Sequence, residues 1–187
     1  EWLPQELVVY ADALVEQTLD VQLADDASFL SAEIVRLGRT AAGEDLGQGC
    51  WRSAVSIHRI GKNGSRWEQV DRIELLGDAL HHRHGLNGDA VFGTLMWAAP
   101  KQLTRNEMTE LLEDARESRN GLNARQMNCS ALEQGLIARY LGNSSRDARF
   151  WFSRIWGLTR RLRGLNKPTI PRVWPLQENP LLGYISE

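Results

Sequence analysis

The sequence contains little cysteine and no long apolar run. Its two cysteines, Cys50 and Cys129, are far apart and stand in no CxxC or CxxH spacing, so neither a disulfide framework nor a zinc site is indicated. No stretch approaches the roughly 18 consecutive apolar residues of a transmembrane helix, and no charged segment leads into a signal-like apolar run. We therefore expect a cytoplasmic protein whose visible chain carries neither a membrane span nor an export signal.

An excess of one charge is also absent. Lys and Arg number 22 and Asp and Glu number 24, which leaves a formal net charge of −2. This balance gives no reason to expect a nucleic-acid or membrane-surface binder, so we expect the partner to be a protein or a small ligand. The 187 residues, of which 42% are hydrophobic, are enough for one domain with a substantial core.

Most of the periodic segments have the pattern of β-strands. Polar and apolar residues alternate from Leu14 to Leu23, as expected for a half-buried strand. Gly61-Lys62-Asn63-Gly64 is a strong hairpin signal between two apolar segments. We expect further strands directly after Trp2-Leu3-Pro4 and over Ser28 to Leu37, Cys50 to Ile60, Arg66 to Leu75, Phe92 to Ala99 and Leu136 to Leu141.

Two other segments have a helical period. Thr104 and Glu107 form a capping-box pattern before an apolar stripe, which predicts a helix from Thr104 to about Ser118. Apolar residues at three- and four-residue spacings predict a second helix over residues 145–163. Together with the strands, these helices indicate a mainly β fold with a few helices.

The second helix also carries arginines interleaved with tryptophans. Such a pattern occurs in nucleic-acid-binding surfaces, but here the aromatic residues fall at core-facing spacings. We therefore expect a packed helix with a basic end. The stripe predicted to face the core consists of Ala148, Phe152, Ile155, Trp156 and Leu162.

His81, His82 and His84 are the only local cluster of potential metal ligands. Adjacent histidines on a strand point to opposite faces, and the segment lies among glycines, so an exposed loop is the favoured interpretation. The alternative is a metal-binding or hydrolytic enzyme that uses this cluster with Asp78 or Asp89. No catalytic motif of a known hydrolase type supports that alternative, and we assign no metal site.

The glycine-rich segment from Gly38 to Glu44 does not match a phosphate-binding loop, because it lacks the spacing of either common motif. From physical chemistry alone, its glycines indicate a loop with unusual backbone conformations. Arg39 and Glu44 offer a second interpretation, in which a guanidinium and a carboxylate form an ordered pair or line a polar passage.

Three motifs resemble the UreD/UreH family of urease accessory proteins in order and spacing. They are Trp2-Leu3-Pro4-Gln5-Glu6, Gly38-Arg39-x-Ala41-x-Gly43-Glu44 and Pro171-Arg172-Val173-Trp174. The resemblance implies two layers of strands, wound helically, with a few helices attached. It also implies that residues 1–187 are a single UreD-like domain that lacks the family's N-terminal β-rich portion.

The resemblance further implies a non-enzymatic scaffold for nickel delivery. Such a protein binds apo-urease and the accessory proteins UreF and UreG, and nickel passes through it without being tightly bound. Arg39 and Glu44 are the candidates for lining the nickel path, because they stand in the family motif and a carboxylate is a suitable transient ligand. A third possibility is a β-rich interaction module with no role in metal transfer.

Overall fold

The computed structural model describes residues 1–61, 64–122, 126–174 and 178–181. These residues form eight β-strands and two α-helices. The strands are β1 (Leu7–Val9), β2 (Leu14–Ala24), β3 (Phe29–Leu37), β4 (Cys50–Gly61), β5 (Gly64–Leu76), β6 (Val91–Ala98), β7 (Met127–Leu132) and β8 (Gly135–Gly142). The helices are α1 (Arg105–Glu117) and α2 (Ser145–Leu162), with short 3-10 helices η1 (Thr40–Ala42) and η2 (Gly77–Leu80).

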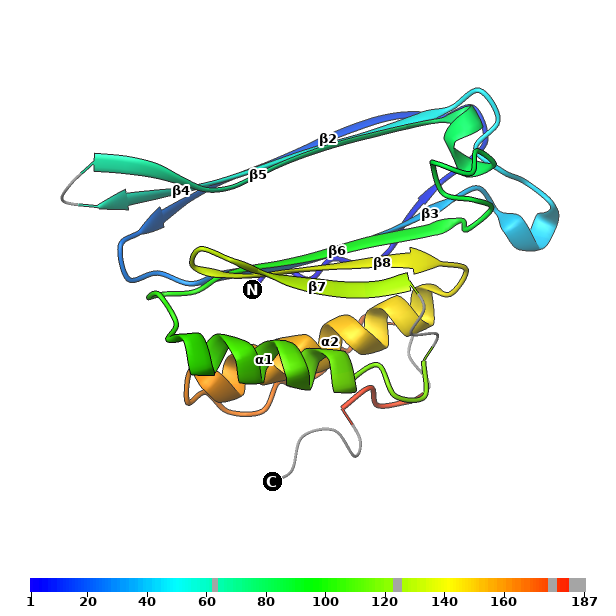
Figure 1. The fold of residues 1–187 in the computed structure, drawn as a ribbon. Coiled ribbons are helices and arrows are strands. Elements are labelled where there is room, and N and C mark those ends of the chain that lie inside the picture. Colours follow the sequence, from blue (N-terminus) through cyan, green and yellow to red (C-terminus); the bar gives the residue numbers. More distant parts are fainter. Residues whose placement is uncertain (62–63, 123–125, 175–177, 182–187) are drawn as a thin grey trace.

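The described elements form three layers (Figure 1). A five-stranded sheet in the order β1-β3-β6-β8-β7 lies in the middle. The three-stranded sheet β2-β4-β5 covers one face of it, and both helices cover the other face. None of the described helices has the length and apolar character that a membrane crossing needs.

The chain passes repeatedly from one sheet to the other. It runs from β1 in the larger sheet to β2 in the smaller one, then back to β3 and across again to β4. As a result β1 pairs with β3 and β2 with β4, both in parallel. Successive strands of each sheet therefore run in the same direction at this end of the chain, as in a helically wound pair of strand layers. The structure confirms the prediction of a mainly β fold with two such layers.

The predicted strands are present, with ends that shift by one or two residues. Gly61 and Gly64 pair across the predicted hairpin, whereas Lys62 and Asn63 lie outside the described residues. Strand β7 was not predicted. Its sequence contains no β-branched residue. The strand lies at the edge of the sheet and pairs with β8, so its conformation depends on this neighbour more than on local propensity.

Both predicted helices are confirmed. In α1 the Thr104 hydroxyl accepts a hydrogen bond from the backbone N–H of Glu107, while the Glu107 carboxylate accepts one from the N–H of Thr104. In α2 the cap is Ser144, whose hydroxyl accepts from the N–H of Asp147. Of the predicted stripe of α2, four residues are buried and Leu162 is exposed.

Two arginines of α2 are buried in the middle of the helix, which the sequence pattern did not indicate. Arg149 donates a hydrogen bond to the carbonyl of Pro4 at 2.8 Å. Arg154 donates to the carbonyls of Ser118 and Pro180 at 2.6 and 3.1 Å. Because these donors reach backbone acceptors from other segments, α2 is covered on its outer side as well as against the sheet.

The core between the two sheets is divided into two apolar clusters. One surrounds Trp51 and Leu37 at one end of the strands, and the other surrounds Ile57 and Met96 at the opposite end. A separate and larger cluster lies between the five-stranded sheet and the helices. Between the two inter-sheet clusters, polar side chains that include Glu33, Ser53 and Thr94 stand among apolar ones, and the candidate site lies there.

Candidate functional site

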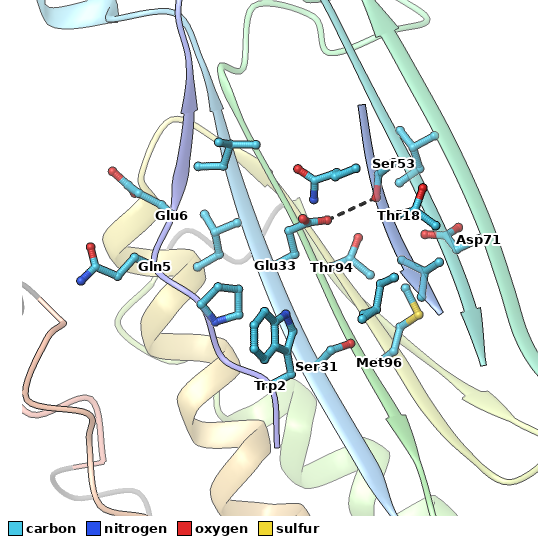
Figure 2. Close-up of a pocket in the computed structure, with 17 residues that line it drawn as sticks. Trp2, Gln5, Glu6, Thr18, Ser31, Glu33, Ser53, Asp71, Thr94 and Met96 are labelled. Atoms are coloured by element: carbon cyan, nitrogen blue, oxygen red, sulfur yellow. Dashed lines mark hydrogen bonds between the residues drawn. The ribbon is translucent and has the colours of Figure 1, made fainter. Parts of the chain in front are cut away.

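A cavity of about 400 Å³ lies between the two sheets (Figure 2). The N-terminal segment lines one side of it, β3 and β6 form one wall, and β2, β4 and β5 form the other. The polar residues of the lining are Gln5, Glu6, Gln17, Thr18, Ser31, Glu33, Ser53, Asp71 and Thr94. Lys, Arg and His are absent from the lining that the structure describes.

Glu33 extends from β3 toward the smaller sheet. Its carboxylate accepts a hydrogen bond from the Ser53 hydroxyl of β4 at 3.4 Å, which joins the two sheets (Figure 2). Burial raises the pKa of Glu33, and the nearby negative charge of Asp71 raises this pKa further, while the bond from Ser53 opposes the shift. Glu33 is therefore a partly buried carboxylate with weak local compensation for its negative charge.

Asp71 enters the cavity from β5. Its Oδ1 accepts a hydrogen bond from Nη2 of Arg139 at 2.7 Å, and Arg139 belongs to β8 of the opposite sheet. A second Arg139 nitrogen donates to the hydroxyl of Thr94. This ion pair joins the cavity lining to β8.

The lining can present oxygen ligands to a divalent cation. Carboxylates and hydroxyls bind such ions without the strong preference for soft metals that thiolates have. In the described part of the chain, no three His, Cys, Asp or Glu side chains gather closely enough to hold a metal ion.

Arg39 and Glu44 form the ion pair that their sequence spacing suggested. The guanidinium donates to both carboxylate oxygens of Glu44 and lies over the ring of Tyr10, with its carbon 4.9 Å from the ring centroid. The hydrogen bond from Arg39 lowers the pKa of Glu44. This pair lies on the surface outside the cavity lining, and its role in nickel transit stays a prediction.

The glycines of the same motif have backbone functions. Gly38 has a φ of +78°, and a Cβ there would lie 2.4 Å from the carbonyl oxygen of Glu44. Gly43 also has a positive φ, in the left-handed conformation that ends the η1 turn. The motif thus folds the loop that brings Arg39 to Glu44.

The histidine cluster is exposed. His81 Nε2 lies 3.1 Å from a carboxylate oxygen of Asp45, and the rings of His82 and His84 are 5.5 Å apart between centroids. Of the carboxylates proposed as partners, Asp89 already accepts hydrogen bonds from side-chain amides of Gln126 and Asn143. The geometry agrees with an exposed loop.

The first and last sequence motifs meet on α2. Gln5 donates from Nε2 to the carbonyl of Val173 at 2.7 Å. The guanidinium of Arg149 lies over the ring of Trp174 at 4.5 Å, and Trp174 contacts Trp156 edge to face. Trp2, Pro4, Gln5 and Glu6 also line the cavity, whereas Pro171, Arg172 and Trp174 do not. These two motifs therefore connect the helical layer to the cavity mouth.

Sequence reasoning missed Glu33 and Asp71, which line the cavity, and Arg139, which bonds to Asp71. Glu33 and Arg139 each stand in a segment correctly predicted as a strand, at positions that alternate with core residues. A charged residue on the inward face of a buried strand is unusual and was the available signal. Asp71 carried the same signal, because it stands on the face of β5 that also holds Ile73 and Leu75.

Comparison with known proteins identifies the family. Residues 1–175 match the family described as UreD urease accessory protein. The chain is 80% identical over 181 residues to "Urease accessory protein UreD" of Synechococcus sp. (strain CC9902), covering 97% of the chain and 58% of that relative. Proteins of the same name from Parasynechococcus marenigrum (strain WH8102) and Prochlorococcus marinus (strain NATL1A) are 66% and 51% identical, over 98% and 96% of the chain.

The chain spans 58% of the length of each of these three relatives. The match to the family nevertheless extends over all three sequence motifs and over every helix and strand of the described fold. The chain therefore belongs to the UreD family of urease accessory proteins.

Proposed function

We propose that this chain is a non-enzymatic scaffold that delivers nickel to apo-urease, together with UreF and UreG, in the cytoplasm. Nickel passes between the two sheets through the cavity that contains Glu33 and Asp71. The observation that supports this proposal most directly is the cavity itself, because it places the carboxylates of Glu33 and Asp71 in an otherwise apolar interface between the sheets.

The burial of Glu33 supports a role in handling a cation. Even partial burial of a carboxylate is costly unless it is paired, and the described structure gives the partly buried Glu33 a single, long hydrogen bond from Ser53. An apolar residue here would stabilise the sheet interface better. A divalent cation inside the cavity would supply the missing positive charge while it passes.

The weakness of the ligand set supports release of the metal. Histidine and cysteine are absent from the described lining, so the oxygen ligands exchange more readily than a nitrogen and sulfur site would. A carrier that must give up its metal to urease needs such a set.

The test is the substitution Glu33→Gln in the full chain, co-expressed with urease, UreF and UreG. The amide keeps the size and the acceptor for Ser53 but removes the charge. We expect unchanged co-purification of the partners and a several-fold fall in the nickel content of urease. The control is Glu113→Gln, which removes an exposed carboxylate from α1 and should change neither quantity. Unchanged nickel content with Glu33→Gln would exclude passage past this residue.

A further inference from the structure

Arg139 stands next to the cavity lining and bonds to two of its residues, Asp71 and Thr94. In the strand register, Glu33 of β3 pairs with Thr94 of β6, and Thr94 pairs with Arg139 of β8. Directly paired residues of antiparallel strands lie on the same face, so these three side chains form a row across the larger sheet, facing the smaller one. Asp71 meets the end of this row from the opposite sheet.

The guanidinium of Arg139 is held from several sides. It bonds to the carboxylate of Asp71 and the hydroxyl of Thr94, and it lies over the ring of Phe92 with 5.7 Å to the centroid. The Arg139 side chain is nonetheless 32% exposed, whereas that of Asp71 is 16% exposed. Its charged group therefore has water available if it leaves Asp71.

The charges in the cavity are unequal. Glu33 and Asp71 both line the cavity, and the negative charge of Asp71 raises the pKa of Glu33. The guanidinium of Arg139 is a positive charge in direct contact with one of them. Without that cation, the carboxylates of Glu33 and Asp71 and the hydroxyls of Ser53 and Thr94, which all line the cavity, would offer oxygen ligands to a divalent metal.

We propose that Arg139 is an internal counter-ion that competes with nickel for Asp71, so that the cavity holds the metal only in passing. This inference rests on the proposed function, because it concerns the same cavity. A nickel ion that binds Asp71 must displace a guanidinium and then lies near its positive charge, and both effects weaken binding. When the metal leaves, Arg139 pairs with Asp71 again.

Nickel affinity of the purified full chain, measured by calorimetry with nickel alone, tests the inference. Arg139→Met keeps most of the stem volume and removes the charge, so it should tighten nickel binding about tenfold or more. Arg139→Lys retains a cation and should bind nickel as the parent does. Adding Asp71→Asn to Arg139→Met should abolish the gain.

A purely structural role for Arg139 predicts a different result. Loss of an inter-sheet bridge alone would lower the melting temperature of Arg139→Met without creating a nickel site. The inference is wrong if nickel binding does not tighten, or if the gain persists when Asp71 is also replaced. Arg139→Gln provides a second neutral variant, and failure of both neutral variants to fold would show that Arg139 is a structural bridge only.

Urease activation separates this inference from the proposed function. Retention of nickel by Arg139→Met should lower the nickel content of co-expressed urease, with rescue by Arg139→Lys. If Glu33→Gln lowers the nickel content of urease but Arg139→Met gains no nickel affinity, the passage stands and the counter-ion role fails. If Arg139→Met gains affinity but Glu33→Gln leaves urease fully loaded, the cavity binds nickel without being the delivery path.

Discussion

Gln5 donates a hydrogen bond from its side-chain amide to the carbonyl of Val173, across 168 positions of sequence. This bond joins the Trp-Leu-Pro-Gln-Glu motif to the Pro-Arg-Val-Trp motif over the outer side of α2. Arg149 strengthens the junction, because it bonds to the carbonyl of Pro4 and stacks on Trp174. The two motifs together fix the N-terminal segment that lines the mouth of the cavity.

The first prediction concerns this junction. Burial lowers the pKa of Arg149, which means that its charge is held at a cost. Arg149→Met should destabilise the protein by about 2 kcal/mol, since it leaves the Pro4 carbonyl without this donor and removes the cation from Trp174. Urea unfolding followed by tryptophan fluorescence measures the change. Arg163→Met, at an exposed position after α2, is the matched control and should have little effect.

The second prediction concerns the pH dependence of stability at Glu33. Its folded-state pKa lies above the ordinary value, so its stabilising contribution is fully present below the unfolded-state pKa and is lost as pH rises through the folded-state pKa. Glu33→Gln removes this loss. The variant should melt at a higher temperature than the parent at neutral pH, and the difference should shrink as the pH falls through the raised folded-state pKa and be gone below the ordinary value of 4.5. Thermal unfolding across this pH range measures it, and a difference independent of pH would contradict the assignment.

The third prediction compares Glu44 with Glu33. Glu44 is ion-paired with Arg39 on the surface, so Glu44→Gln should leave folding and partner binding intact. The sequence motif predicts a lower nickel content of co-expressed urease, and the position outside the cavity predicts that this fall is smaller than with Glu33→Gln. The nickel content of urease purified after co-expression with each of the two variants shows which substitution has the larger effect. A larger effect of Glu44→Gln would move the nickel path to the surface loop.

The fourth prediction concerns the histidine cluster. The three rings are exposed and one of them faces a single carboxylate, so we expect no submicromolar nickel site there. Replacing His81, His82 and His84 by Ala should leave the tightest nickel binding seen by calorimetry unchanged. Tight binding that disappears in this variant would show that the cluster is a metal site.

The fifth prediction concerns the cap of α1. Thr104→Ala removes the acceptor for the backbone N–H of Glu107 and should cost about 1 kcal/mol of stability. Thr109→Ala is the matched control within the same helix, because its hydroxyl bonds only to a carbonyl one turn back. Chemical denaturation should show a clear loss for the first variant and little or no loss for the second.

The positions of most strands and both helices followed from the sequence alone. Alternation in β2 and the capping box of α1 are local signals, and each depends on residues only a few positions apart. Strand β7 lacked such a signal because its conformation is imposed by pairing with β8. Sequence patterns therefore predict a helix or strand when the polar and apolar side chains of that element show its period.

The motifs also identified the family from sequence, whereas the cavity required the tertiary structure. Glu33 and Asp71 are 38 positions apart on different sheets, and Arg139 is a further 68 positions along the chain. Their proximity results from strand register within one sheet and from packing of the second sheet against it. No periodicity in a single strand encodes that packing, so the sequence determined which residues face inward, and only the fold decided which of them meet.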